Sequence, residues 1–349
     1  MKRKSKKSII LIFLGIILII FGSVMQLNDD SDEQKKCVFL GKLESGVEYV
    51  NGPYTYRYME EASGAGRDGD QSWAKMDVDG WGVVLTNRQS DDPVNTAPCT
   101  YINDKPIVSM GYLFALSNTK AIDLSNFNTS NVINMRDMFT GINVDKLDFG
   151  GFDTRNVTNM SGMFSHISIS KLDLSSFDTS KVTNMMDMFG MTTIDELNIS
   201  SFDTSNVKTM YAMFRYAKIK NLDLSKLDTS NVTTFTYMFD YSEFDKLDLS
   251  NFNTSNATTM SYMFSNSKIN ELNITNFDTR KVTDMGHMFE YSKIPVLDLS
   301  SFDVSNLQKT YSMFDGATAT IGYARTQKDA DYFNKTYYRP RGLIFKVKK

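Results

Sequence analysis

The stretch Leu172-Asp-Leu-Ser-Ser-Phe-Asp-Thr-Ser-Lys-Val-Thr-Asn-Met-Met-Asp-Met-Phe189 decides the fold, because close copies of it return every 25 residues. A Met-Phe pair closes each copy, and Leu113-Phe114 extends the series by one degenerate unit. The pairs are Met138-Phe139, Met163-Phe164, Met188-Phe189, Met213-Phe214, Met238-Phe239, Met263-Phe264, Met288-Phe289 and Met313-Phe314. A fixed period over so many units is the signature of a solenoid, in which each coil buries its apolar face only against its neighbours.

Within one unit, the apolar residues first recur every two positions and then every three to four positions. Leu172 and Leu174 alternate with polar neighbours, which predicts a short strand. A second set falls at i, i+3, i+6 and i+7, which predicts one apolar stripe on about two turns of helix. That set is Val182, Met185, Met188 and Phe189. Residues 178–180, Asp-Thr-Ser, supply side-chain oxygens suited to the start of such a helix.

Stacking of the coils turns each position of the repeat into a column. One column is aromatic, with Leu227 as its exception, and the Met-Phe pairs form a second. The aromatic column comprises Phe127, Phe152, Phe177, Phe202, Phe252, Phe277 and Phe302. Methionine adapts to irregular gaps, so we expect the methionines of the stripe to fill the core rather than bind a metal.

The unit Leu-Asp-Leu-Ser-x-Phe-Asp-Thr-Ser-x-Val-Thr-x-Met-x-x-Met-Phe resembles the 25-residue repeat of BspA-like leucine-rich-repeat surface proteins of bacteria, over roughly residues 108–316. Residues 319–331 also resemble the segment that closes such arrays. The resemblance implies an α/β solenoid of the leucine-rich-repeat kind, with parallel strands, short helices and a cap at each end. It also implies an exported protein with a role in adhesion, and it implies no catalytic residues.

The N-terminus predicts a membrane anchor. Five basic residues lie within positions 2–7, and the chain from Ile9 to Leu27 then carries no charge. A helix of that length spans nearly the whole hydrocarbon core, and the basic flank places the N-terminus in the cytoplasm. We therefore expect a cytoplasmic tail at 1–7, a transmembrane signal anchor at 8–27 and an extracellular chain from about Asn28.

Two alternatives to an uncleaved anchor are a cleaved signal peptide and a lipoprotein. Against the first, Ser23-Val24-Met25 lacks the small-x-small pattern of a cleavage site. Against the second, Cys37 follows Gln34-Lys35-Lys36, where lipid attachment needs apolar and small residues.

Four further segments complete the predicted organisation: a linker at 28–36, a small β-rich module at 37–108, nine repeats at 109–316 and a cap at 317–349. In the module, the alternation around Asn51-Gly52 predicts a hairpin, and residues 80–85 predict another strand. Cys37 and Cys99 form a possible disulfide, because both lie outside the predicted membrane segment. In the cap we expect a strand at 320–324, a helix at 327–334 and a strand at 343–347.

Composition argues against several classes of function. The net charge of −3 gives no electrostatic case for nucleic-acid binding. The chain has two cysteines and two histidines, which leaves little material for metal sites or activated nucleophiles. His166 and His287 lie at the Met-Phe end of the predicted helix, and we expect neither to meet a nucleophile. We therefore predict no enzyme, no cofactor and no metal site.

The outward residues of the predicted strands form two columns on either side of the first strand leucine. The column before it is Ala121, Lys146, Lys171, Glu196, Asn221, Lys246, Glu271 and Val296. The column after it is Asp123, Asp148, Asp173, Asn198, Asp223, Asp248, Asn273 and Asp298. Lysine accompanies aspartate in three coils, and where glutamate replaces lysine the aspartate has become asparagine. No coil carries two negative charges, as expected of i, i+2 residues on one strand face.

This charged strand face is the predicted ligand-binding surface. In a leucine-rich-repeat geometry it is concave, and three lysines and eight carboxylates line it. We predict a membrane-anchored scaffold that binds a host or matrix protein or a glycan there. The candidate residues are Lys146, Asp148, Lys171, Asp173, Glu196, Asn198, Asn221, Asp223, Lys246, Asp248, Glu271 and Asn273. The alternatives are a solvated sheet face on a passive envelope spacer, cation binding between coils, and a polysaccharide-processing enzyme.

Overall fold

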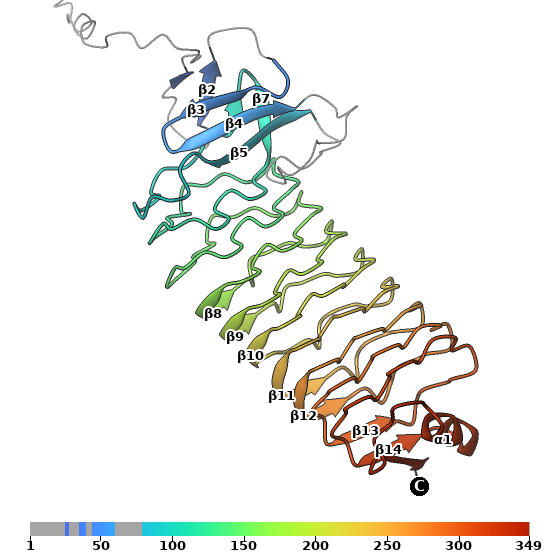
Figure 1. The fold of residues 1–349 in the computed structure, drawn as a ribbon. Helices are drawn as coiled ribbons and strands as arrows, with labels where there is room; N and C mark the ends of the chain where they lie inside the picture. The colour runs from blue at the N-terminus through green and yellow to red at the C-terminus, as the bar shows by residue number, and fades with distance from the viewer. Residues whose placement is uncertain (1–24, 28–34, 40–43, 60–78, 349) are drawn as a thin grey trace, which may run out of the picture.

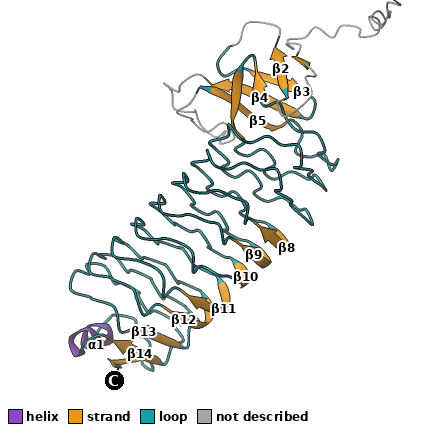
Figure 2. Ribbon diagram, turned by 180° about the vertical axis from the view of Figure 1, so that it is seen from behind, coloured by secondary structure: helices purple, strands orange, loops and turns teal. Residues whose placement is uncertain are grey.

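The computed structural model describes residues 25–27, 35–39, 44–59 and 79–348. Its main body is a β-solenoid of about 11 turns with parallel strands and very little helix. The coils stack in one direction, with a small sheet at the N-terminal end and a capping helix and strands at the other (Figures 1 and 2). The predicted repeat architecture is confirmed, but the predicted short helices are not.

The N-terminal sheet contains seven strands in the order β1-β2-β6-β7-β5-β4-β3. Their bounds are β1 Met25–Leu27, β2 Lys36–Phe39, β3 Glu48–Asn51, β4 Tyr54–Met59, β5 Gly80–Leu85, β6 Tyr101–Ile102 and β7 Lys105–Ser109. β3 and β4 form the hairpin predicted around Asn51-Gly52, with Asn51 opposite Tyr54. The first full coil pairs with this sheet, since the Ile133 N–H donates to the Val108 carbonyl at 2.9 Å. The sheet therefore covers the apolar end of the solenoid.

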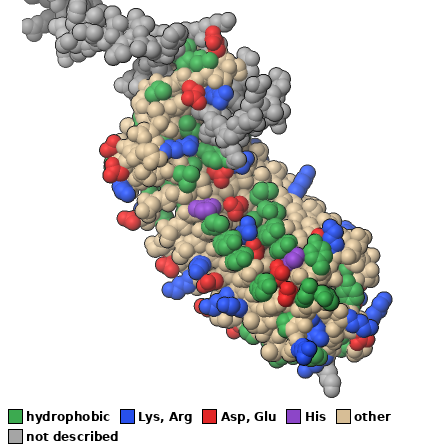
Figure 3. Space-filling view, viewed as in Figure 1, with side chains coloured by type: hydrophobic (Ala, Val, Ile, Leu, Met, Phe, Trp, Pro, Cys, Tyr) green, Lys and Arg blue, Asp and Glu red, His purple; other side chains and the backbone are tan. Residues whose placement is uncertain are grey.

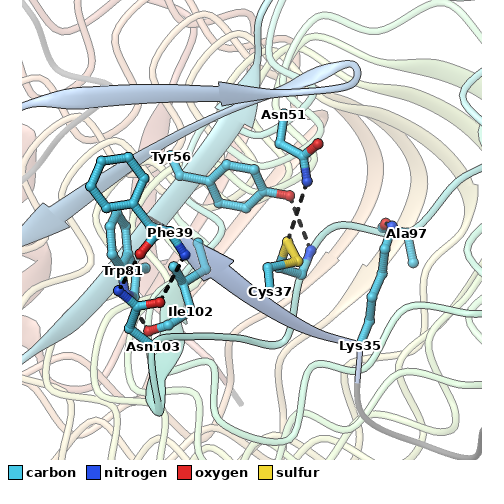
Figure 4. Close-up of a disulfide and its surroundings, with 10 residues drawn as sticks. Lys35, Cys37, Phe39, Asn51, Tyr56, Trp81, Ala97, Ile102 and Asn103 are labelled. Atoms are coloured by element: carbon cyan, nitrogen blue, oxygen red, sulfur yellow. Dashed lines mark hydrogen bonds between the residues drawn. A yellow bond between two sulfur atoms is a disulfide. The ribbon is translucent and has the colours of Figure 1, made fainter. Parts of the chain in front are cut away.

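A disulfide joins Cys37 in β2 to Cys99 in the loop before β6 (Figure 4). Both cysteines are buried, and the Cys99 N–H donates to the Tyr56 hydroxyl at 3.0 Å. Nearby, the indole N–H of the fully buried Trp81 donates to the Ile102 carbonyl at 3.1 Å. The crosslink ties β2 to the loop between β5 and β6.

On one long side of the solenoid, here the strand side, short parallel strands pair in register. A five-stranded sheet contains β8 Ser168–Asp173, β9 Thr193–Asn198, β10 Lys218–Asn221, β11 Glu243–Asp248 and β12 Lys268–Asn273. Each residue pairs with the residue 25 positions later, as Ile169 does with Ile194. Leu172 and Leu174 are fully buried, so the predicted strand core is confirmed.

On the opposite side, here the turn side, the residues 185–191 and their equivalents form successive turns. The predicted helix over Val182–Phe189 is wrong. The Gly190 N–H bonds locally to the Asp187 carbonyl at 3.0 Å, but the Phe189 and Met191 N–H groups donate to Met213 and Arg215 of the next coil. In an α-helix all of these N–H groups would donate to carbonyls of the same coil. The turns therefore form a second ladder between coils.

The three residues expected to cap that helix serve the corner instead. The Asp178 carboxylate accepts the Ser180 N–H at 3.0 Å, which closes a local turn. The hydroxyl of the fully buried Thr179 donates to the Asp203 carbonyl and accepts the Asp203 N–H, both at 2.8 Å. The same threonine contact recurs along the array, so a column of buried hydroxyls joins coil to coil.

Two aromatic columns run through the core, as predicted. The phenylalanines of the Met-Phe pairs stack from Phe114 to Phe314, with neighbouring ring centroids 5.5–6.0 Å apart. The second column is also buried, and Phe152 stacks on Phe177 at 6.5 Å. Met185 and Met188 are fully buried beside these rings, which confirms that the methionines of the stripe fill the core.

The C-terminal cap consists of β13 Val296–Leu299, β14 Ile321–Ala324, α1 Gln327–Asn334 and β15 Ile344–Val347. The strands form a parallel sheet, and α1 begins at Thr326, whose side chain accepts the Asp329 N–H. Phe333 of α1 and Phe345 of β15 pack on Phe314, the last ring of the core stack, at 5.9 and 5.0 Å. The predicted strand, helix and strand are all present.

The predicted anchor at 8–27 lies largely outside the described residues. Its last three residues, Met25–Leu27, form β1 and pair with β2, so the predicted helical boundary at Leu27 is wrong. In the part of the chain that the structure describes, no helix has the length and apolar character needed to cross a membrane.

Candidate functional site

The predicted strand-face columns are exposed and aligned. Lys171 pairs with Glu196, and Lys246 pairs with Glu271, in adjacent strands. The charge balance predicted within each coil operates mainly between coils. The Lys171 ammonium lies 3.7 Å from the Glu196 carboxylate, and the Asn198 amide donates to Asp173 at 2.9 Å. Among the column lysines that the structure describes, Lys146 alone forms an ion pair inside its own coil, with Asp148 at 3.1 Å.

The aspartate column also has a structural role that the sequence analysis missed. The Asp173 carboxylate accepts the N–H of Ser175 at 3.1 Å, and the same bond follows the strand in neighbouring coils. These hydrogen bonds from Ser175 lower the pKa of Asp173. Asn198 and Asn273 make the same turn with their side-chain oxygens. The column therefore ends the strands, whether or not a ligand binds there.

The extent of strand pairing follows the charges of the two columns. A Lys-Leu-Asp strand pairs along its full length with a Glu-Leu-Asn strand that follows it. β8 pairs in this way with β9 from Ser168 to Asp173, and β11 pairs with β12 from Glu243 to Asp248. In contrast, β10 meets β11 only at Lys218 and Glu243, and there Asp223 would face Asp248. Adjacent strands therefore pair along their length where opposite charges face each other and an amide faces a carboxylate, as expected for cross-strand neighbours.

The coil before β8 contains no strand. Its residues 142–150 include Lys146-Leu147-Asp148, which would face the identical Lys171-Leu172-Asp173 of β8. Within the described ranges no backbone hydrogen bond joins residues 142–150 to residues 167–175. In the later coils the equivalents of the Ser168 N–H donate to the preceding coil at 2.7–3.0 Å, as Thr193 does to Ile167 and Lys293 does to Ser267. Among the described residues, the Asn143 N–H likewise makes no bond to the coil before it. We call residues 142–150 the open coil.

The opening is confined to the strand side. The open coil keeps its turn-side bond, from the Gly141 N–H to the Ser165 carbonyl at 2.9 Å. Its corner is also closed by the Thr154 hydroxyl, which donates to the Asp178 carbonyl at 2.9 Å. One residue sets this coil apart in the core: Phe149 stands where later coils have Leu or Ile, and its ring contacts Phe177 edge-on at 5.1 Å. The coil that carries the larger Phe149 ring is thus the coil that does not pair with β8.

A pocket of about 560 Å³ lies at this opening. Four of the predicted site residues line it: Lys146, Asp148, Lys171 and Asp173. Leu147 and Phe149 supply apolar surface, and hydroxyls come from the segment 170–176. Its size is in the range of ligand pockets. A second hollow of about 270 Å³ runs over β9–β12 and includes Lys218, Glu243 and Asp245.

An exposed aromatic surface lies on the turn side, where the sequence analysis placed no site. Aromatic side chains there form a continuous strip, here the tyrosine strip, beside the two histidines (Figure 3). Its members are Tyr211, Tyr216, Tyr237, Tyr241, Tyr262, His287, Tyr291 and Tyr311. Tyr241, Tyr291 and Tyr311 are 44%, 54% and 59% exposed, which is unusual for residues of this size in one cluster.

The rings of the strip support one another across coils. Tyr216 stacks on Tyr241 at 4.5 Å, and Tyr262 stacks on Tyr237 at 4.6 Å and on His287 at 4.3 Å. The Arg215 guanidinium lies 5.0 Å from the ring centres of both Tyr216 and Tyr237, which is a cation–π contact. It is held there by the buried Asp240 at 2.9 Å.

Most of these aromatic residues have an unfavourable backbone conformation. Tyr216, Tyr237, Tyr241, Tyr262, His287 and Tyr291 have φ between 51° and 59°. Other coils place Gly141, Gly162 and Gly316 at the same two repeat positions, with φ of 61–65°. For a bulky residue the left-handed region costs on the order of 1–2 kcal/mol. The strip therefore presents large side chains where the backbone favours glycine.

The comparisons with known proteins concern the repeat. A family model described as "Mycoplasma protein of unknown function, DUF285" matches residues 94–195, 142–247, 166–269 and 218–322. Together these overlapping matches run from 94 to 322, which is more than half of the chain. The chain belongs to this family. No curated protein and no solved structure matches it.

Neither histidine of this DUF285 protein forms a recognisable catalytic arrangement. The expectation that neither meets a nucleophile is wrong for His166, whose Nδ1 lies 2.8 Å from the Ser165 hydroxyl. That hydroxyl also donates to Asp187 at 3.1 Å, so serine lies between histidine and aspartate. Nucleophile activation needs the imidazole in the middle. The His287 Nδ1 pairs with Glu290 at 2.9 Å instead.

The sequence of this DUF285 protein did contain a signal for the strip. Tyr237 and Tyr262 are 25 residues apart, as are Tyr216 and Tyr241, so tyrosines recur at fixed positions of the repeat. The helix prediction hid the signal, because Tyr237 and Tyr262 fell outside its apolar stripe and Tyr216 and Tyr241 fell beyond its end. Among the described residues no group of three or more His, Cys, Asp or Glu side chains could hold a metal ion.

Proposed function

We propose that this protein is a membrane-anchored extracellular scaffold that binds a protein ligand through the tyrosine strip and performs no catalysis. The anchor rests on the basic residues and the uncharged segment from Ile9 to Leu27. The extracellular location is supported by the Cys37–Cys99 disulfide, since disulfides persist in oxidising compartments. The resemblance of the repeat to BspA-like surface proteins supports the same location and an adhesive role.

The observation that carries the proposal is the row of exposed aromatic rings at left-handed backbone positions. Such strain is retained where the surrounding structure enforces it, and it gathers at binding and catalytic sites. Here two ladders of hydrogen bonds hold the backbone, so the rings lose little freedom when a partner covers them. Burial also raises the pKa of Tyr237 and Tyr262, so their hydroxyls stay neutral donors.

A protein fits the strip better than a glycan does. The faces of Tyr216, Tyr237 and Tyr262 are occupied by neighbouring rings, which leaves their edges and hydroxyls for a ligand. Sugar rings bind aromatic faces, whereas protein partners also use edges and phenol hydroxyls. Serine, glycine and asparagine surround the tyrosines at Ser261, Gly286 and Asn266. Tyrosine with such small polar neighbours is the composition of an antibody paratope.

The strand face remains a second candidate, as the sequence predicted. It is favoured by the pocket that brings Lys146, Asp148, Lys171 and Asp173 together. A passive envelope spacer is the alternative to both surfaces.

The test compares the full-length chain in detergent micelles with two variants on panels of extracellular matrix proteins and of glycans. Tyr241→Gly with Tyr291→Gly removes two exposed rings where glycine relieves backbone strain. We expect this variant to fold with undiminished stability and to lose protein binding by at least about tenfold. The control, Lys171→Glu with Asp173→Lys, changes the strand face and keeps that binding.

Three results would contradict the proposal. Binding lost only in the strand-face control assigns the ligand to that face. Binding to glycans but to no protein assigns the wrong ligand class. No binding on either panel supports the spacer.

A further inference from the structure

We infer that the opening between the open coil and β8 is a receptor site for an extended peptide strand with the pattern Glu-x-Asn. This site lies on the strand side, so it is independent of the tyrosine strip. Three features of the molecule point to it: the interrupted ladder, the charges that border the opening, and the pairing of the other strands.

The interrupted ladder provides the backbone partner. The Ser168 N–H at the start of β8 is not bonded to the preceding coil, although its equivalents from Thr193 to Thr318 all are. β8 is also the last strand of its five-stranded sheet. An exposed strand edge next to a pocket of about 560 Å³ is the geometry that accepts an added strand.

The ion pairs of the lysines that border the opening do not cross it: Lys146 pairs with Asp148 of its own coil, and Lys171 pairs with Glu196 of β9. Lys146 and Lys171 stand on its two sides, 77% and 63% exposed, with no glutamate rung between them. Asp148 and Asp173 also border the opening. No asparagine lies between these two aspartates, whereas Asn198 of β9 donates to Asp173 from the other side. A strand inserted between Lys146-Leu147-Asp148 and Lys171-Leu172-Asp173 would have a lysine and an aspartate on each side. It therefore needs an acidic residue opposite the two lysines and an amide donor opposite the two aspartates.

The protein itself shows which strand pairs with a Lys-Leu-Asp edge. Both Lys-Leu-Asp strands of the closed sheet, β8 and β11, are followed by Glu-Leu-Asn strands and pair along their length. In these pairs Asn198 and Asn273 each donate to the preceding aspartate at 2.9 Å. At the opening the third Lys-Leu-Asp segment, Lys146-Leu147-Asp148, is followed by β8 instead of a Glu-Leu-Asn strand. An external peptide with that pattern would complete the ladder.

Two peptides from the chain itself provide the test. The probe is residues 192–200, Thr-Thr-Ile-Asp-Glu-Leu-Asn-Ile-Ser, and the control is residues 242–250, Ser-Glu-Phe-Asp-Lys-Leu-Asp-Leu-Ser. Both have nine residues and the same net charge, with blocked ends. Fluorescence anisotropy of labelled peptides is measured against the full-length chain in detergent micelles. We expect the probe to bind at least about tenfold more tightly than the control, as two complementary contacts replace two like-charged ones.

Variants of the receptor side distinguish recognition from general stickiness. Lys146→Glu with Lys171→Glu should abolish the preference for the probe, while Lys220→Glu with Lys226→Glu, the same total charge change on and just after β10, should keep it. Probe binding should also slow hydrogen exchange at the Ser168 amide. Equal binding of both peptides, no binding of either, or an unchanged preference in the double variant would overturn the inference. Equal melting temperatures of the three proteins exclude misfolding as the cause.

Discussion

The two long sides of the solenoid are made by the same 25-residue unit, yet one ladder is continuous and the other is interrupted. On the turn side, the N–H of each Met-Phe phenylalanine from Phe114 to Phe289 donates to the methionine carbonyl of the next coil at 2.9–3.0 Å. On the strand side, pairing is full between some coils and partial between β10 and β11, and within the described residues no backbone hydrogen bond joins the open coil to either neighbour. Identical spacing therefore does not guarantee identical pairing.

The difference lies in what borders each ladder. Buried, uncharged rings stack beneath the turn side, so every coil meets its neighbour in the same way. Charged columns border the strand side, where Lys171 faces Glu196 favourably but Asp223 would face Asp248. The turn side thus provides stability, and this lets it carry strained tyrosines. The strand side is adjustable, and this lets it open.

The largest effect that tests this comparison is expected from the core stack of the turn side. Phe214→Ala removes a fully buried ring that stacks on Phe189 at 5.5 Å and on Phe239 at 5.6 Å. We expect a loss of about 3–5 kcal/mol in the free energy of unfolding, the usual cost of such a cavity. Urea unfolding followed by far-UV circular dichroism measures it, with Phe214→Leu as a milder control. A loss below about 1 kcal/mol would mean that the stack is not what stabilises the array.

A smaller effect is expected at the open coil. Phe149→Leu restores the aliphatic residue that follows the strand in most coils, and it withdraws a ring that contacts Phe164 and Phe177. We expect a change of less than about 1.5 kcal/mol, as for other similar-sized hydrophobic exchanges. If the ring holds the strand side apart, the Ser168 amide should exchange more slowly in the variant. Exchange at the wild-type rate would show that the like-charged Lys-Leu-Asp rungs suffice to keep the coil open.

The sequence predicted the strand side better than the turn side, for a physical reason. Alternation of Leu172 and Leu174 has one structural meaning, because a strand is the only regular element with a period of two. Inward residues at Met185, Met188 and Phe189 fit a helix, but they fit a set of turns equally well. The two differ in where backbone N–H groups bond, which side-chain spacing does not report. Glycine at positions 141, 162 and 316 was the available signal, since glycine weakens a helix and suits a left-handed turn.

The binding surfaces were only partly predictable for related reasons. The charged columns followed from the strand period, so Lys146, Asp148, Lys171 and Asp173 were identified. Their convergence on one pocket depends on the missing ladder before β8, which involves coils 25 residues apart. The tyrosine strip depends on the turn geometry and was hidden by the helix prediction. The cap helix at residues 327–334 was predicted well because its capping residue, Thr326, precedes an uninterrupted helical segment.

The smallest effect concerns pH, and it has opposite signs on the two sides. Hydrogen bonds from Ser175 lower the pKa of Asp173 below its ordinary value of 3.8, so its stabilising contribution is complete above pH 3.8 and is lost as the pH falls through the folded-state value. Burial raises the pKa of Asp187 on the turn side, so the folded state gains a proton before the unfolded state does. Stability from that group therefore rises as the pH falls through its folded-state pKa toward 3.8.

Asparagine variants at these two aspartates separate the contributions. Asp173→Asn keeps the turn, because Asn198 and Asn273 make the same bond in their own coils. We expect the free energy of unfolding to change by no more than about 0.5 kcal/mol at pH 7. Between pH 4 and pH 3 this variant should lose less stability than the wild type does. Asp187→Asn suits the φ of 55° and removes a buried charge, so it should raise the melting temperature at pH 7 and remove the gain on acidification. Melting temperatures from pH 7 to pH 3 measure both. If the two variants shift the profile in the same direction, the contrast between the exposed Asp173 of the strand side and the partly buried Asp187 of the turn side does not hold.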